Sequence, residues 1–169
     1  MTQNPFALLG LTESFELDVL DLEKRVREVQ RNDHPDRATT PLERRLRMGR
    51  AVDVNEAFRT LKDDLSRAKA LLALRGVDVN GNEQPAEPDF LMEVMELREA
   101  LGDAREAKRL AEVSQLGARV EVLCAATKAE FSARFSKDDF AGARSTLAKL
   151  RYYRRFLDEV AVIEEEAAL

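Results

Sequence analysis

The chain contains a single histidine, His34, which stands two residues before a carboxylate in the stretch His34-Pro35-Asp36. A histidine beside a carboxylate could act as a general base with the group that orients it. No serine or cysteine nucleophile, glycine-rich loop or cluster of metal ligands accompanies this pair, and one histidine with one cysteine cannot build a zinc site. We therefore expect a protein that is not an enzyme and that carries no cofactor.

Two helical patterns flank this stretch. Proline lacks a backbone N–H and disfavours helical geometry at the preceding residue, so a helix arriving from the N-terminal side must end near His34. Leu22, Val26 and Val29 recur at helical spacing before it. The apolar positions of the second pattern are Leu46, Val54, Ala57, Phe58 and Leu61. The sequence predicts two helices joined by a polar loop, which together form a hairpin. The simplest role of a lone histidine at this place is to cap the end of the first helix of the hairpin.

Basic side chains occupy the face of the first helix that lies away from its apolar residues. Lys24, Arg27 and Arg31 fall on this face at roughly 100° per residue. Exposed cations can steer an acidic partner surface toward the loop, which would then engage the partner through specific polar contacts. A face that is simply solvated remains the alternative for each of these residues.

The segments around the loop resemble a known family. Residues 4–11 (NPFALLGL) are similar to the short first helix and turn of a J-domain, and residues 54–61 (VNEAFRTL) to its helix after the His-Pro-Asp loop. Residues 67–76 (RAKALLALRG) and 90–99 (FLMEVMELRE) extend the resemblance to the HscB-type co-chaperones of iron-sulfur cluster assembly, over essentially the whole chain. J-domains stimulate the ATPase of DnaK-type chaperones, so the resemblance implies such a chaperone (HscA-like) as partner.

The resemblance assigns residues to the chaperone contact. The binding loop would be His34, Pro35 and Asp36, and the electrostatic dock would be Lys24, Arg25, Arg27 and Arg31. The sequence departs from the family at both flanks of the loop. Arg37 stands where the family usually has lysine, which keeps the charge and changes its geometry, and Asp33 stands where an aromatic residue usually precedes the histidine.

A second candidate site lies on the helix predicted after Pro88. Its apolar stripe at helical spacing consists of Phe90, Val94, Leu97 and Leu101, which is enough to bury the helix. Leu91, Met92 and Met95 lie off that stripe, among carboxylates. Apolar residues on a face that the core does not need indicate a protein-binding surface, and methionine there would adapt to a partner's shape. A helix buried on two sides is the alternative.

The resemblance makes this face the contact for the iron-sulfur cluster scaffold protein (IscU-like). The residues that it assigns are Leu91, Met92, Met95, Glu96, Glu99, Asp103 and Tyr152. Asp103 is shorter than the glutamate of better-known members. Packing in the core beside Tyr153 is a serious alternative for Tyr152.

Composition indicates an all-α protein. Hydrophobic residues make up 44% of the chain and charged residues 35%, with 6% aromatic residues, no tryptophan and no strand-like alternation.

The N-terminal residues 1–5 show no secretory signal, and the longest apolar run, 70–74, is too short to span a membrane. The one cysteine, Cys124, excludes an intramolecular disulfide, fits a reducing compartment, and is expected to be a buried, inert thiol. We expect a cytoplasmic protein with no membrane partner.

The predicted organisation is an N-terminal J-domain helical hairpin over residues 1–76, a linker over 77–88, and a C-terminal three-helix bundle over 89–169. The linker prediction rests on an Asn-Gly turn signal and two prolines. The expected helices cover about 19–33, 41–61, 67–74, 89–101, 103–135 and 136–167, with Asp18, Thr40 and Ser136 as N-caps and Gly76 as a stop. The predicted turn between the last two helices is 135–137.

The function expected from the resemblance is that of a co-chaperone that stimulates a DnaK-type ATPase and brings the scaffold protein to it. One alternative is a J-domain adaptor for a different client protein. Another is a helical nucleic-acid binder that uses Arg44, Arg45, Arg47 and Arg50. A formal net charge of -5 argues against general nucleic-acid binding, and those arginines are most simply a solvated face.

Overall fold

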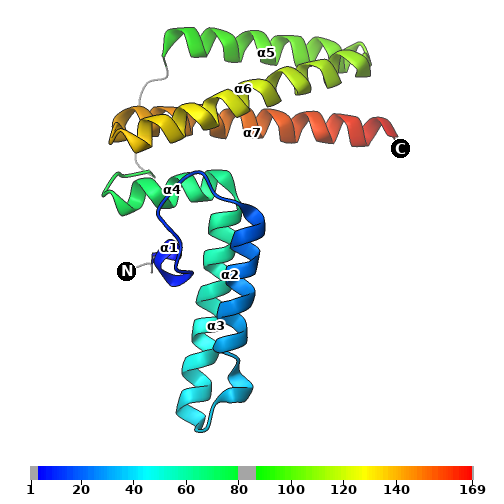
Figure 1. Cartoon of the computed structure of the whole chain (residues 1–169). Coiled ribbons are helices and arrows are strands. Elements are labelled where there is room, and N and C mark those ends of the chain that lie inside the picture. The colour runs from blue at the N-terminus through cyan, green and yellow to red at the C-terminus, as the bar shows by residue number, and fades with distance from the viewer. Residues whose placement is uncertain (1–3, 80–86, 169) are drawn as a thin grey trace. The chain divides into compact units, whose positions relative to one another are not determined.

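The computed structural model describes residues 4–79 and 87–168, and within these ranges it contains helices and no strand. The α-helices are α1 (Pro5–Leu8), α2 (Val19–Asn32), α3 (Pro41–Lys62), α4 (Asp64–Leu74), α5 (Pro88–Glu106), α6 (Leu110–Ser136) and α7 (Phe140–Ala168) (Figure 1). The all-α prediction is confirmed. None of the described helices combines the length and the apolar content that crossing a bilayer requires.

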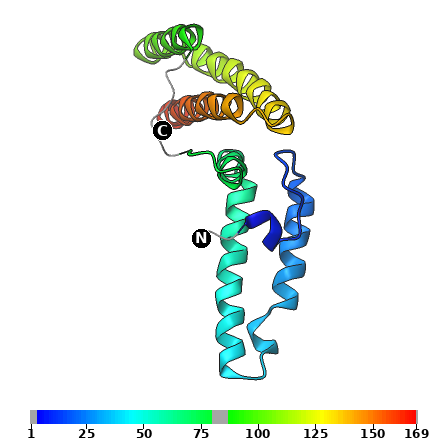
Figure 2. The ribbon, with the colours of Figure 1, turned by 90° about the vertical axis from the view of Figure 1, so that its left-hand side faces the viewer.

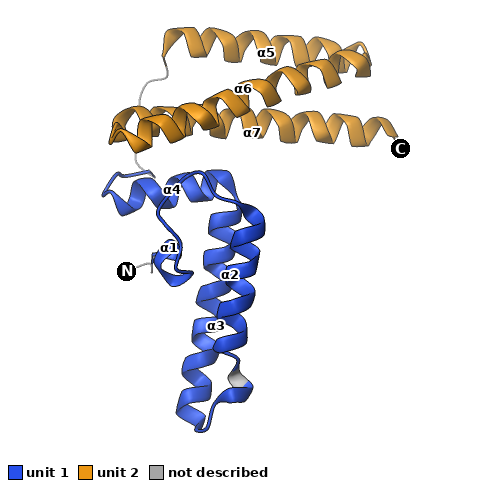
Figure 3. Cartoon of the chain, in the orientation of Figure 1, with its two compact units in different colours: residues 1–79 blue, residues 80–169 orange. Residues whose placement is uncertain are grey.

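The chain divides into two compact units, residues 1–79 and residues 80–169, which are coloured separately in Figure 3. Each unit has its own buried apolar residues. The predicted linker 77–88 falls largely on residues 80–86, which lie outside the described residues. The predicted domain boundaries therefore stay a prediction.

In the first unit α2 and α3 form an antiparallel hairpin, with α1 and α4 packed against α3 (Figures 1 and 2). Its core contains the predicted residues Leu22, Val26, Val54, Ala57 and Leu61, together with Phe6, Leu9, Phe15, Ala68, Leu71 and Leu72. Leu46 was expected to share this apolar face, but it is 66% exposed. It lies in the half of α3 that begins near the loop, where α3 extends beyond the residues that it buries.

Local capping sets the ends of the hairpin helices as predicted. The Asp18 side chain accepts a hydrogen bond from the backbone N–H of Leu20 at 2.8 Å, and the Thr40 hydroxyl accepts one from that of Glu43 at 3.1 Å. Each interaction satisfies an N–H that has no partner within its own helix. Gly76 ends α4 with φ +73°, a left-handed conformation that glycine adopts at little cost.

Helix α4 begins earlier than predicted. Asp63 caps both the end of α3 and the start of α4, and its carboxylate accepts a hydrogen bond from the Ser66 N–H at 2.8 Å. Arg67 therefore lies inside the helix, where it is buried and donates to the carbonyl oxygen of Phe15 at 2.9 Å. Because this acceptor is remote in sequence, the burial of Arg67 depends on tertiary packing.

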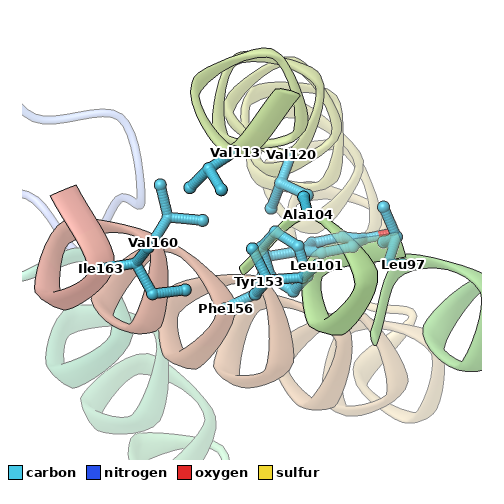
Figure 4. Packing of buried hydrophobic residues seen from close by; sticks show 9 residues of the cluster. All are labelled: Leu97, Leu101, Ala104, Val113, Val120, Tyr153, Phe156, Val160 and Ile163. Atoms are coloured by element: carbon cyan, nitrogen blue, oxygen red, sulfur yellow. The ribbon is translucent and has the colours of Figure 1, made fainter. Parts of the chain in front are cut away.

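In the second unit the long helices α6 and α7 pack against each other, and α5 packs on α6. Their side chains converge on one core, shown in Figure 4: Leu97, Leu101, Ala104, Val113, Val120, Tyr153, Phe156, Val160 and Ile163. Apolar residues at helical spacing along the two long helices, from Val113 to Phe131 in α6 and from Ala143 to Val160 in α7, are buried or half-buried where the helices meet. Gly117 allows close approach of α6 to α7, since a Cβ there would lie 3.1 Å from Val160 Cγ1.

Three predicted helix bounds in this unit are wrong. Helix α5 does not stop before Gly102 but continues to Glu106, and a turn follows at residues 107–109, where Lys108 has φ 53°. The next helix, α6, therefore begins at Leu110 and not at residue 103. Ser136 is not the N-cap of the last helix, because it is the final residue of α6 and its hydroxyl donates to the Ala133 carbonyl oxygen. The turn follows Ser136 instead of centring on it, and Asp139 accepts from the Gly142 N–H at 3.0 Å at the start of α7.

Candidate binding surfaces

The His34 loop is exposed at the tip of the α2/α3 hairpin. Helix α2 ends at Asn32, and residues Pro35–Arg37 form one short 3-10 turn instead of an open loop. The His34 side chain is 58% exposed, and its Nδ1 accepts a hydrogen bond from the Asp36 N–H at 3.2 Å. A neutral ring that accepts at Nδ1 carries its proton on Nε2. His34 and the 78% exposed carboxylate of Asp36 thus present one donor and one acceptor group to a partner.

Arginines of α3 hold the loop from the side. Arg47 Nη1 donates to the Asn32 carbonyl oxygen at 3.1 Å, and Arg50 Nε lies 2.9 Å from Asp33 Oδ2. Arg44 reaches Asp36 more loosely, at 4.0 Å. The sequence had assigned these arginines to a solvated face. The structure instead connects them to the end of α2 and to the loop, which the helical pattern of α3 alone did not indicate.

Glu43 completes this support. Its carboxylate accepts from the backbone N–H and the hydroxyl of Thr39, both at 2.9 Å, and pairs with Arg47 at 2.7 Å. The Thr39 N–H, then Arg47 and the Thr39 hydroxyl, lower the pKa of Glu43 to about 2. The loop between the hairpin helices is therefore held at both ends by polar contacts, which favours one fixed geometry for His34 and Asp36.

The predicted electrostatic dock is exposed on α2. Lys24, Arg25, Arg27 and Arg31 are all exposed. Arg25 lies 3.6 Å from Glu28 and Arg27 lies 3.7 Å from Glu23. Exposed pairs of this kind contribute little to stability, so both cations can exchange their partner for another carboxylate. The structure thus leaves this basic face accessible, and its role as a dock stays a prediction.

The off-stripe apolar residues of α5 are also exposed. Leu91 is 49%, Met92 62% and Met95 70% exposed, whereas Leu97 and Leu101 on the other side of the helix are buried. Helix α5 is therefore not buried on two sides in this structure. We use the name α5 face for the exposed group Leu91, Met92, Met95, Glu96, Glu99 and Asp103.

Tyr152 stands apart from this group. Its side chain is half-buried, its hydroxyl donates to the Val94 carbonyl oxygen at 3.2 Å, and its ring meets Phe90 edge to face at 5.8 Å. The Arg98 guanidinium lies over the same ring at 5.8 Å. Tyr152 thus packs against α5 beside Tyr153, and its direct contact with a scaffold protein stays a prediction.

No second chemical centre appears among the described residues. Cys124 is half-buried against the core of the second unit and forms no disulfide. Across residues 4–79 and 87–168, no group of three or more histidine, cysteine, aspartate or glutamate side chains is arranged to hold a metal ion. The two exposed surfaces, around His34 and on α5, remain the candidate sites.

Comparison with known proteins relates both units to one family. A family model described as the HSCB C-terminal oligomerisation domain matches residues 86–161. A Vibrio cholerae protein named Co-chaperone protein HscB homolog is 34% identical over 167 residues, which cover 96% of this chain and 98% of that protein. A protein of the same name from Paraburkholderia phymatum is 45% identical over 113 residues, 65% of each chain.

Solved structures agree with these sequence relatives. The chaperone HscB from Vibrio cholerae aligns with a TM-score of 0.82 and 31% identity, covering 97% of this chain and 99% of that chain. The human co-chaperone protein HscB aligns with a TM-score of 0.85 and 28% identity, covering 96% of this chain and 83% of that chain. The likeness therefore extends through the hairpin unit as well as the three-helix unit.

Proposed function

Because the chain belongs to the HscB family of co-chaperones, we propose that it stimulates the ATPase of a DnaK-type chaperone and delivers the scaffold protein of iron-sulfur cluster assembly to that chaperone. The observation that carries this proposal is the presence of two exposed surfaces of different chemistry on one chain. The first is formed by the His34 loop and the basic face of α2, and the second is the apolar α5 face. In this scheme the chain binds and delivers, and it changes no covalent bond itself.

The hairpin unit is the proposed contact for the chaperone, an HscA-like protein. Lys24, Arg25, Arg27 and Arg31 would attract an acidic surface of the ATPase and raise the rate of encounter. The loop would then make the specific contact through His34, Pro35 and Asp36. Support for this assignment comes from the exposure of His34 and Asp36 and from the polar contacts that Arg47 and Arg50 make at the loop.

The α5 face is the proposed contact for the scaffold, an IscU-like protein. Leu91, Met92 and Met95 are exposed although their helix already buries Leu97 and Leu101. Covering such a patch with a partner removes apolar area from water, and the carboxylates around it supply a polar rim. Flexible methionine side chains can adapt to the shape of the partner surface.

Coupling between the two activities follows from carrying both surfaces on one chain. A scaffold bound to the α5 face is held near any chaperone bound to the loop, which raises its effective concentration there. The scaffold is therefore within reach of the chaperone while the chaperone hydrolyses ATP. This coupling needs no conformational signal between the two surfaces.

Steady-state ATP turnover by a purified DnaK-type chaperone tests the proposal. The chain and the scaffold are added separately and together, and turnover is expected to rise most with both. His34→Gln should abolish stimulation while scaffold affinity stays the same. Met92→Ala with Met95→Ala should weaken scaffold binding about tenfold or more and leave the stimulation seen without scaffold intact.

Val122→Ala is the matched control for the α5 substitutions, since Val122 is 70% exposed but lies on α6 outside the α5 face. It should match the unsubstituted chain in every assay. Normal stimulation by His34→Gln would remove the loop from the mechanism. Stimulation without any scaffold binding would instead favour an adaptor for a different client.

A further inference from the structure

Helix α5 is held to its unit in two different ways along its length. Its C-terminal half is anchored by apolar burial of Leu97, Leu101 and Ala104. In its N-terminal half the apolar residues that face the rest of the unit, Phe90 and Val94, are only half-buried. Leu91, Met92 and Met95 of the α5 face belong to this N-terminal half, so their position depends on whatever fixes it.

Aromatic and polar contacts from α7 fix this half. The Tyr153 side chain is only 3% exposed, and its hydroxyl donates to Glu93 Oε2 at 3.0 Å. Phe90 meets the rings of Tyr152 and Tyr153 edge to face at 5.8 and 5.9 Å. We call Phe90, Glu93, Tyr152 and Tyr153 the α5 clamp.

The two clamp residues that lie on α5, Phe90 and Glu93, alternate along this helix with residues of the α5 face. Leu91 and Met92 lie between Phe90 and Glu93, and Met95 follows two residues after Glu93. Successive side chains of a helix leave its axis roughly 100° apart, so fixing the direction of residues 90 and 93 fixes that of residues 91, 92 and 95. Rotation of the N-terminal half of α5 about the helix axis would turn Leu91, Met92 and Met95 away from a partner.

A hydrogen bond suits this task better than apolar contact alone. Apolar packing has no strong directional preference, whereas a buried hydroxyl needs a partner at a defined distance and angle. Burial, followed by the hydrogen bond to Glu93, raises the pKa of Tyr153, which keeps its hydroxyl protonated and able to donate.

We propose that Tyr153 and Glu93 are positioning residues for the α5 face, and that the hydrogen bond between them sets the rotation of the first turns of α5 and so the placement of Leu91, Met92 and Met95. This inference rests on the proposed function, in which the α5 face binds the scaffold. Tyr153 itself is too deeply buried to touch the scaffold, and it acts through the orientation of α5.

Methionine methyl groups give a direct measure of this placement. The chain has four methionines, of which Met92 and Met95 lie on the α5 face and Met48 lies on α3 in the other unit. In the full-length chain without scaffold, Tyr153→Phe and Glu93→Leu should each move the methyl resonances of Met92 and Met95 and leave that of Met48 unchanged. Both variants should weaken scaffold binding by about threefold to tenfold.

Two further variants separate positioning from other roles. Glu93→Gln keeps an oxygen acceptor for the Tyr153 hydroxyl and should bind the scaffold nearly as well as the unsubstituted chain. Tyr153→Phe combined with Glu93→Leu should lose no more than either change alone, because both remove the same interaction. ATPase stimulation without scaffold should stay the same in all four variants.

Unmoved Met92 and Met95 resonances in Tyr153→Phe and Glu93→Leu would overturn the inference, even if both variants melt at lower temperature. Equal loss of affinity in Glu93→Gln and Glu93→Leu would also overturn it, since the carboxylate would then contact the scaffold directly. The methyl spectra are recorded without scaffold, so their result does not depend on the proposed function. Failure of that function would appear as unchanged affinity in Met92→Ala with Met95→Ala.

Discussion

At the scale of single residues, Glu43 links the start of α3 to the loop that precedes it. The Thr40 hydroxyl accepts from the Glu43 N–H while the Glu43 carboxylate accepts from the Thr39 N–H, a reciprocal arrangement like a capping box. The same carboxylate orients Arg47, which donates to the last residue of α2, Asn32. Removing one carboxylate would thus loosen the cap and the loop support together.

The lowered pKa of Glu43 predicts a pH dependence. A carboxylate with a folded pKa of about 2, below its ordinary value of 4.5, contributes stability above about pH 4.5 that is lost as pH falls toward 2. We therefore expect Glu43→Gln to melt at lower temperature than the unsubstituted chain at pH 7, and the difference to shrink at pH 4 and again at pH 3. Thermal melts followed by circular dichroism measure this difference.

Glu56→Gln is the control for that experiment, because Glu56 is an exposed carboxylate on the same helix. Its melting temperature should follow that of the unsubstituted chain across the pH range. A constant difference between Glu43→Gln and the unsubstituted chain from pH 7 to pH 3 would contradict a carboxylate held ionised by Thr39 and Arg47.

How far single residues could be predicted depended on the range of their contacts. The exposed group Leu91, Met92 and Met95 followed from helical spacing, since the buried stripe of α5 left them on the other side. The loop contacts of Arg47 and Arg50 could not be predicted, because their partners lie on α2 and its C-cap. Only the packed hairpin brings those groups together.

At the scale of elements, helix ends were predictable where the signal was local. Asp18 and Thr40 each cap a helix within two or three residues of their own position. The start of α7 depended instead on burial, because Ser136 stays in α6 directly after the buried Phe135, which stacks on Phe131 and contacts Phe140. Asp139 instead accepts a hydrogen bond from the Gly142 N–H at the start of α7.

Helix α5 passes its predicted end for a related reason. The predicted helix 89–101 ended just before Gly102, and a glycine inside a helix costs about 1 kcal/mol relative to alanine. Leu101 and Ala104, on either side of it, are 3% and 0% exposed, so ending the helix there would disturb two core positions. Core burial outweighs the local preference, and the helix continues to Glu106.

Two helical glycines in the second unit should respond oppositely to added side chains. Gly102 is exposed, and a Cβ added there would meet nothing within 4 Å, so Gly102→Ala should stabilise the unit by about 0.5–1 kcal/mol. A Cβ added at Gly117 would lie 3.1 Å from Val160, so Gly117→Leu should destabilise the unit by about 1–3 kcal/mol through overpacking. Denaturant unfolding of the full chain gives both values. An unchanged unfolding midpoint for Gly117→Leu would mean that α6 and α7 separate at low cost.

At the scale of the whole molecule, the two surfaces belong to different compact units. The His34 loop lies in residues 1–79 and the α5 face in residues 80–169. Sequence resemblance anticipated both surfaces, and the family relationship extends over nearly the whole chain. What sequence could not supply is how firmly each surface is held, which depends on the contacts of Arg47 and Arg50 in one unit and of Tyr153 in the other.

If coupling arises only because both surfaces share one chain, separating the units should abolish it. Fragment 1–79 should retain the stimulation seen without scaffold, and fragment 80–169 should retain full scaffold affinity, since each unit has its own core. Mixed at micromolar concentration, the fragments should lack the additional turnover that scaffold causes with the intact chain. Joining two modules supplies an effective concentration of about a millimolar, so the scaffold concentration for half-maximal effect should rise by about a hundredfold or more. Steady-state ATP turnover measures this loss, and a mixture that matches the intact chain would mean that the scaffold and the chaperone associate without help from the connection.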